Sequence, residues 1–110
     1  MIELKKNFSK YGDEFTQLYK KNGIAIYRRS NEHYDDVFEI FKIRVSKQDM
    51  YHEDMYERYP QEEAFGNWAW CAHGIHQLYA VLRQCLNLTK EDVSKLIECY
   101  ITDSKNTTLQ

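Results

Sequence analysis

The chain has 110 residues and a formal net charge of −2, and 43% of its residues are hydrophobic while 29% are charged. This composition excludes an intrinsically disordered chain, and the length suits one compact domain over residues 1–110. The sequence contains neither a run of about 18 apolar residues nor an apolar signal-peptide segment, so we expect a cytoplasmic protein that does not span a membrane.

The first predicted elements are two strands on either side of Asn22 and Gly23. The flanking segments 15–21 (FTQLYKK) and 24–30 (IAIYRRS) are rich in aromatic and β-branched residues. Asn-Gly between two such segments is the strongest local signal for a β-hairpin, because both residues tolerate the positive φ of a type I′ turn. A helix over residues 13–21 that ends at Gly23 is the alternative.

The clearest predicted strand covers residues 34–46, YDDVFEIFKIRVS. Its residues alternate between two faces, as the period of a strand requires. One face carries Val37, Phe41, Ile43 and Val45, and the other carries Phe38, Ile40, Lys42 and Arg44. The second face becomes basic toward its end, so we expect that end to meet solvent.

A long connection over residues 46–66 follows, and it is acidic and rich in tyrosine. Its length is unusual for a loop, so we expect it to be functional, locally helical or mobile. Residues 53–59 suit a helical turn or two. Residues 60–66 suit a short helix that is opened by Pro60 and closed by Gly66.

The C-terminal part predicts a short strand and two helices. Residues 67–72 alternate, which places Trp68 and Trp70 on one buried face. The following helix carries an apolar stripe at helical spacing: Ile75, Leu78, Tyr79, Leu82 and Leu86. Thr89 and Asp92 then resemble a capping box that opens a last helix, whose apolar residues are Val93, Leu96, Ile97 and Tyr100. We expect the polar tail, residues 102–110, to be frayed.

Together these elements predict the α+β class. We expect a small antiparallel sheet of three to four strands, packed against one or two C-terminal helices, because this arrangement buries both apolar stripes.

Three segments, GIAIYRRS, YDDVFEIFKIRV and ERYPQEEAFGNWAW, carry a resemblance. In this order they resemble a group of small uncharacterised proteins of bacteriophages and mobile elements, which show an AIY strand, a YEVF strand and a YPSxExFGxxAW-like turn. The resemblance covers roughly residues 15–80; its most specific part is 59–70, and Gln61 and Glu62 depart from the usual Ser-Asn or Ser-Ser. The group has no established catalytic residues. The resemblance implies a small α+β domain of phage or prophage origin, and such proteins frequently disable host machinery, as anti-CRISPR inhibitors do.

Cys71, His73 and His76 are the candidates for a metal or catalytic site. They are possible zinc ligands, but a structural site needs a fourth ligand, which Cys85 or His52 would have to provide by folding back. Cys71 and His73 also suit a nucleophile and its base, yet no orienting acid accompanies them. We therefore expect no catalytic residue, no metal and no cofactor. The cysteines are odd in number and lack Cys-x-x-Cys spacing, so we expect free thiols.

A basic group of residues offers a surface for nucleic acid. Its members are Arg28, Arg29, Lys42, Arg44 and Lys47. With Tyr27 and Phe38 interleaved, they suit a basic, aromatic sheet face that binds RNA or single-stranded DNA. This is the alternative function: a small nucleic-acid-binding accessory protein.

The preferred hypothesis uses the acidic connection. Its candidate partner-binding residues are Asp49, Tyr51, Glu53, Asp54, Tyr56, Glu57 and Tyr59. Carboxylates give charge complementarity to a basic channel, and tyrosines give contact area. We expect a non-enzymatic phage or mobile-element protein, located in the host cytoplasm, that binds and inhibits a bacterial defence nuclease such as a CRISPR ribonucleoprotein effector. An open sheet edge or the last helix also allows a homodimer.

Overall fold

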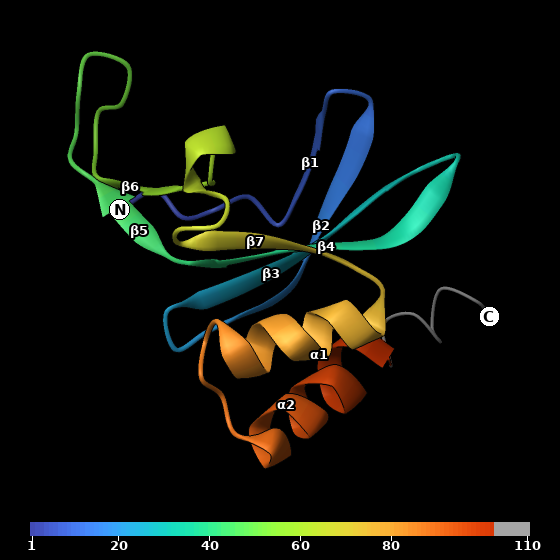
Figure 1. The fold of residues 1–110 in the computed structure, drawn as a ribbon. Helices are drawn as coiled ribbons and strands as arrows, with labels where there is room; N and C mark the ends of the chain where they lie inside the picture. Colours follow the sequence, from blue (N-terminus) through green and yellow to red (C-terminus); the bar gives the residue numbers. More distant parts are fainter. Residues whose placement is uncertain (103–110) are drawn as a thin grey trace.

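The computed structural model describes residues 1–102, with the side chains of Asp35, Asp36 and Thr102 left out (Figure 1). The predicted frayed tail, apart from the backbone of Thr102, lies outside the described residues. The α+β class is confirmed: an antiparallel sheet packs against two C-terminal helices.

The main sheet has five strands in the order β1-β2-β3-β4-β7. They are β1 (Asn7–Lys10), β2 (Asp13–Lys21), β3 (Ile24–Asn31), β4 (Tyr34–Lys42) and β7 (Ala69–His73). The strand of this sheet that the sequence prediction missed is β1, which has a single large apolar residue, Phe8, paired with Phe15 of β2. Such a short edge strand is defined by its backbone pairing and leaves little pattern in the sequence.

The hairpin prediction is confirmed. Asn22 and Gly23 have φ of 55° and 77° and join β2 to β3, so the alternative helix over residues 13–21 is wrong. Tyr11 and Gly12 make a second two-residue turn with φ of 56° and 79°, between β1 and β2. Both turns place two consecutive residues in the left-handed region, as the twist of two-residue hairpins favours.

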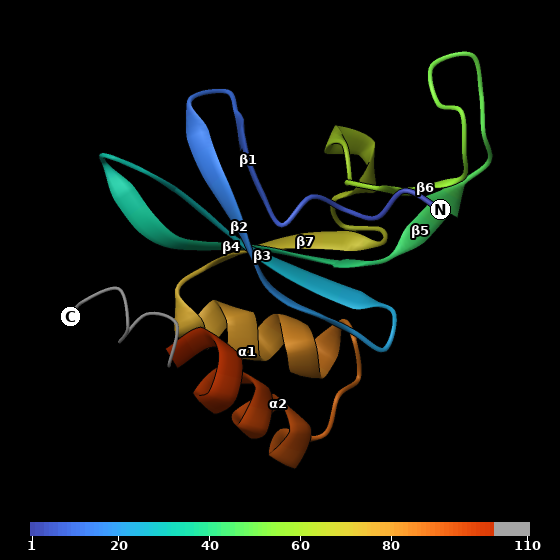
Figure 2. The same cartoon turned by 180° about the vertical axis from the view of Figure 1, so that it is seen from behind.

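Both helices cover one face of the sheet (Figures 1 and 2). They are α1 (Ile75–Gln84) and α2 (Lys90–Leu96), and a π-helical turn, η2 (Ile97–Thr102), continues α2. The predicted cap is present, since the Thr89 hydroxyl accepts a hydrogen bond from the Asp92 amide (3.1 Å). The core on this face includes Ile26, Phe38, Ile40, Leu78, Leu82, Val93 and Leu96. No helix within residues 1–102 is long and apolar enough to cross a membrane.

A second apolar cluster lies on the opposite face of the sheet. Its large members are Phe15, Tyr27, Phe41 and Trp68, with Phe8, Tyr59 and Phe65 packed against them. The tryptophan prediction is therefore wrong in part: Trp68 belongs to this cluster, whereas Trp70 is half-buried and belongs to neither cluster. The reason is that β7 begins at Ala69, directly after the turn at Gly66, so Trp68 stands before the strand and does not follow its alternation.

The connection between β4 and β7 contains a second, two-stranded sheet. It pairs β5 (Arg44–Ser46) with β6 (Tyr56–Arg58), and a short 3₁₀ turn, η1 (Glu62–Ala64), follows. The predicted helical turn over residues 53–59 is wrong. The backbone of Ile2 hydrogen-bonds to Met55 and Glu57 (2.8 and 2.9 Å), so pairing with the N-terminal segment and with β5 overrides the local helical preference.

Candidate partner-binding surface

The most prominent surface feature is the loop between β5 and β6, which we call the acidic loop (residues 47–55). It extends away from the body of the protein on the side of the sheet opposite the helices (Figure 1). At its tip, Met50 is 86% exposed and Tyr51 is 83% exposed. Adjoining exposed apolar side chains can form part of an interaction surface, so this tip is a candidate for one.

The acidic loop has internal hydrogen bonds that fix its tip. The backbones of Asp49 and His52 exchange two hydrogen bonds (3.0 and 3.3 Å), which makes Met50 and Tyr51 the centre of a tight turn. The Asp49 carboxylate accepts a hydrogen bond from the Tyr51 amide (2.8 Å) and lies 2.9 Å from His52 Nδ1. These contacts hold the pKa of Asp49 below its usual value, and the hydrogen bond with His52 has the largest effect.

The base of the acidic loop is fixed by stacking and by the chain terminus. The rings of His52 and Tyr56 stack with centroids 3.7 Å apart, and the Tyr56 hydroxyl donates to Asp49 (3.3 Å). The Met1 ammonium lies 2.8 Å from Asp54, which also accepts from the Met55 amide. The pKa of Asp54 is lowered, chiefly by its hydrogen bond from the Met1 ammonium. The exposed tip therefore stands on an ordered base.

Two of the seven predicted partner-binding residues face the interior instead. Glu57 pairs with Lys20 (2.6 Å) and accepts from the Leu4 amide (3.0 Å), so its carboxylate holds the N-terminal segment in place. Tyr59 packs among the aromatic rings of the second cluster, and its hydroxyl donates to Glu39 (2.8 Å). Burial, and then the Glu39 charge, raise the pKa of Tyr59. The other five predicted residues, Asp49, Tyr51, Glu53, Asp54 and Tyr56, lie in the acidic loop or at its base, and the exposed Met50 lies beside them.

The predicted basic residues do not form one surface. Arg28 and Lys42 pair across the strands with Phe38 and Ile24, which places them on the helix side, whereas Arg29 pairs with Phe15 on the opposite side. The interleaved aromatics, Tyr27 and Phe38, are both fully buried, in different clusters. Arg44 lies over the ring of Trp68 (5.0 Å to the centroid), and Lys47 is exposed at the start of the acidic loop. A continuous aromatic and basic face is therefore absent from residues 1–102.

A network of charged groups, which the sequence did not reveal, lies on the face opposite the helices. Asp13 and Glu39 are only 5% and 4% exposed, and the Arg29 guanidinium joins them, at 2.6 Å from Asp13 and 3.0 Å from Glu39. Asn31 donates to the second oxygen of Asp13 (2.8 Å), and this bond, followed by that from Arg29, lowers the pKa of Asp13. The sequence held one signal for this network. Glu39 is a charged residue that the alternation of the strand places on the same inward face as the apolar Phe41.

The candidate metal and nucleophile residues are only loosely associated. Cys71 Sγ lies 3.9 Å from His73 Nε2, and burial raises the pKa of the Cys71 thiol, which disfavours the thiolate that a nucleophile requires. Among the side chains that the structure describes, no group of three or more from His, Cys, Asp or Glu is arranged to hold a metal ion.

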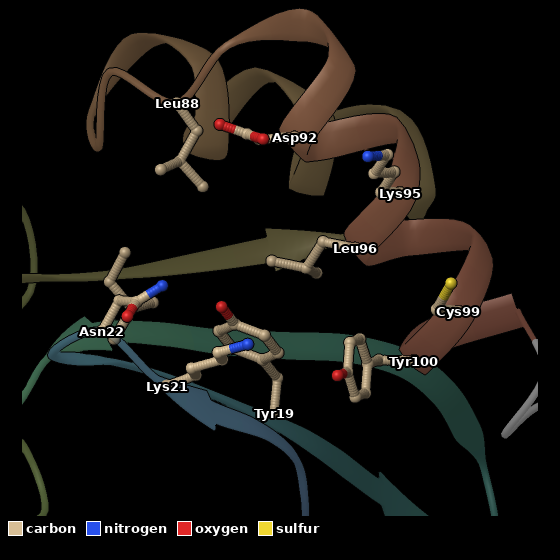
Figure 3. A pocket seen from close by; sticks show the side chains of 10 residues that line it. Tyr19, Lys21, Asn22, Leu88, Asp92, Lys95, Leu96, Cys99 and Tyr100 are labelled. Carbon is tan, nitrogen blue, oxygen red and sulfur yellow. The ribbon is translucent and has the colours of Figure 1, made fainter.

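A separate groove of about 380 Å³ lies between the β2–β3 hairpin and the last helical segment (Figure 3). Its walls are mainly apolar and include Leu88 and Leu96, and the rings of Tyr19 and Tyr100 meet edge to face with centroids 5.2 Å apart. Lys21, Asp92 and Lys95 line it as well, so its charged groups are of both signs. This groove lies between the hairpin and η2, on the helix side of the sheet and away from the acidic loop.

Comparison of the chain with models of protein families, with curated proteins and with solved structures gives no match.

Proposed function

We propose that the protein is a non-enzymatic binding protein that docks its acidic loop onto a basic surface of a larger partner. One observation carries this proposal: Met50 and Tyr51 are almost fully exposed, while Asp49 fixes the turn that presents them. A side chain held on an ordered turn loses little entropy on docking, and aromatic anchors dominate the energy of most interfaces.

The negative charges around the tip would orient the protein as it approaches a positively charged partner. Asp49, Glu53 and Asp54 lie within six residues of one another, and Glu53 is exposed. Negative groups at the rim of an interface mainly accelerate encounter with a positive surface and exclude wrong partners. The apolar tip would then provide most of the affinity.

For the partner, we propose a bacterial defence nuclease of the CRISPR ribonucleoprotein type, which the protein would inhibit. Such an effector holds its nucleic acid in a positively charged channel, a surface that complements the acidic loop. The resemblance to small phage proteins supports the same partner class. The alternative, a nucleic-acid-binding protein, has less support because its basic residues are divided between the two sides of the sheet.

The test compares the wild type with a double variant, Met50→Ala with Tyr51→Ala. Binding is measured to a purified effector with guide RNA, to the effector without it, and to the RNA alone. We expect binding to the effector and none to RNA, and a loss of about 30-fold in affinity for the double variant, as removal of an interface anchor causes. Glu98→Lys, an exposed substitution on the helix side, is the matched control for surface change and should bind as the wild type does.

Unchanged binding of the double variant would contradict the role of the acidic loop. Binding to RNA alone, weakened steeply by salt, would favour the alternative function. Absence of binding to the effector in both forms would contradict the proposed partner class.

A further inference from the structure

A second groove, of about 570 Å³, lies on the face of the sheet opposite the helices. Phe15, Arg29 and Glu39 of the sheet line it, the turn at Lys10 and Tyr11 bounds one side, and residues 59–65 bound the other. The turn and η1 both stand on the side of the sheet from which the acidic loop extends (Figures 1 and 2). The groove and the acidic loop therefore belong to one side of the molecule.

The side chains that line the groove carry one more negative than positive charge: Glu39, Glu62 and Glu63 against Arg29 and Lys10. At its base, the Arg29 guanidinium joins Glu39 to a second largely buried carboxylate, Asp13, which is not part of the lining. Lys10 lies at the edge of the groove, where its ammonium sits over the ring of Tyr11 (5.0 Å to the centroid). It offsets one of these negative charges but forms no ion pair with a side chain that the structure describes. A net charge in a site partly shielded from water attracts an opposite charge more strongly than it does in bulk water.

The rim adds acceptors and aromatic surface. Glu62 and Glu63 are exposed, line the groove, and take part in no ion pair within the described part of the chain. The rings of Tyr11, Tyr59 and Phe65 also line the groove. Carboxylates that alternate with aromatic faces form the environment in which a planar cation gains both hydrogen bonds and cation–π contacts.

Arg29 shows how a guanidinium is held in this environment. It lies over the Phe15 ring (5.2 Å to the centroid) while its Nε and Nη1 donate to the two carboxylates. Each Glu39 oxygen accepts one hydrogen bond, from Arg29 or from Tyr59, and a carboxylate oxygen has capacity for a second. The groove thus retains acceptor capacity next to the internal guanidinium.

We propose that this groove takes an arginine side chain presented by the partner. Arginine fits better than lysine because its planar guanidinium stacks on aromatic rings and directs five donors in fixed directions toward several acceptors. An anionic group is disfavoured by Glu39, Glu62 and Glu63. The inference rests on the proposed function, in which a basic surface approaches the same side of the protein, and it names one residue type on that surface.

The experiment uses the full chain and a five-residue peptide, acetyl-Gly-Gly-Arg-Gly-Gly-amide, followed by amide NMR shifts at low salt. The matched control peptide carries citrulline, which keeps the shape of arginine and removes its charge. We expect millimolar binding of the arginine peptide, with shifts centred on Arg29, Tyr59 and residues 61–65, and binding weaker by about fivefold or more for citrulline. A lysine peptide should fall between the two.

The matched protein variants are Glu62→Gln with Glu63→Gln at the rim, and Glu98→Gln on the helix side. All three glutamates are exposed, so the fold should be retained. We expect the rim variant to bind the arginine peptide with an affinity lower by about fivefold, and Glu98→Gln to bind it as the wild type does. Equal binding of the arginine and citrulline peptides, absence of binding at millimolar peptide, or shifts centred outside the groove would each overturn the proposal.

The two proposals fail in different ways. The Met50→Ala/Tyr51→Ala variant should bind the arginine peptide normally even as it loses the effector, because the acidic loop does not line this groove. Loss of peptide binding by the rim variant, together with normal effector binding by the loop variant, would uphold the groove and reject the loop as the docking element. The reverse pattern would uphold the loop and reject the groove.

Discussion

The two faces of the five-stranded sheet are covered in different ways. On one face, two helices close over an entirely apolar core that includes Phe38 and Leu82. On the other, short segments cover an aromatic cluster that contains polar groups, such as the Tyr27 hydroxyl, which donates to the Lys5 carbonyl (2.7 Å) and accepts from Gln17 (2.9 Å). In the described part of the chain, with the side chains of Asp35, Asp36 and Thr102 left out, every buried side-chain nitrogen or oxygen has a hydrogen-bond partner.

Under the proposed function, this difference assigns stability to one face of the sheet and recognition to the other. An apolar core beneath helices stabilises the fold through burial and offers little to a partner. Hydrogen bonds and ion pairs on the opposite face add less net stability, but they fix the orientation of the groups around them. The acidic loop and the groove next to Arg29 are both built on that polar side.

The largest expected effect comes from breaking the helix side. Phe38→Ala removes a fully buried ring from beneath both helices and should lower the free energy of unfolding by about 3–5 kcal/mol. Urea unfolding followed by tryptophan fluorescence measures the change. Lys42→Ala, an exposed substitution on the same strand, is the control and should change the free energy by less than about 0.5 kcal/mol. A loss below about 1 kcal/mol for Phe38→Ala would mean that this face is not the main source of stability.

A smaller effect is expected on the polar side. Arg29→Met keeps the side-chain volume similar but leaves Glu39 buried without its cation. We expect a loss of about 2–3 kcal/mol at neutral pH, below the range for fully buried pairs because Arg29 is partly exposed. The urea midpoint measures it. Glu14→Gln, an exposed substitution on the neighbouring strand, should leave the midpoint unchanged.

The pH dependence of Arg29→Met sharpens this test. In the wild type the pKa of Asp13 is lowered, by the hydrogen bonds from Asn31 and then Arg29, so this carboxylate stabilises the fold above its ordinary pKa and loses that contribution as the pH falls. In the variant, Asp13 loses one of the two hydrogen bonds that lower its pKa, so it should take up a proton more readily in the folded state. The deficit relative to the wild type should therefore shrink as the pH is lowered toward about 4.5. A deficit that stays constant with pH would attribute the loss to packing.

Much of the fold follows from local signals in the sequence. Asn22 and Gly23 specify a turn by their own backbone preferences, and Thr89 with Asp92 specify a helix start, so both predictions hold without knowledge of the rest of the chain. The strands β1 and β6 were missed because each is only three or four residues long and is defined by partners elsewhere. For β6, those partners include Ile2, more than fifty residues away in the sequence.

The candidate site was only partly predictable for the same reason. The acidic connection appears uniform in composition, yet Glu53 is exposed while Glu57 binds Lys20, and Tyr51 is exposed while Tyr59 is packed among other rings. What separates the two halves is the pairing of β6 with β5 and with the N-terminal segment, which buries one half and leaves the other free. Contacts between distant parts of the chain decide which carboxylates and tyrosines are exposed.

The smallest expected effect concerns the acidic loop itself. Asp49→Asn removes the charge that His52 and the Tyr51 amide stabilise, so the tip should become more mobile while the urea midpoint of the whole protein stays the same. The pKa of Asp49 is lowered, so in the wild type the charged form orders the loop above the ordinary aspartate pKa, and this order is lost as the pH falls below it. Amide ¹⁵N relaxation of Met50 and Tyr51 measures the order. It should fall at acidic pH in the wild type, remain low and independent of pH in Asp49→Asn, and match the wild type in the control Glu53→Gln. A tip that stays ordered in Asp49→Asn at neutral pH would show that stacking of His52 on Tyr56 suffices, and that the carboxylate serves recognition instead of order.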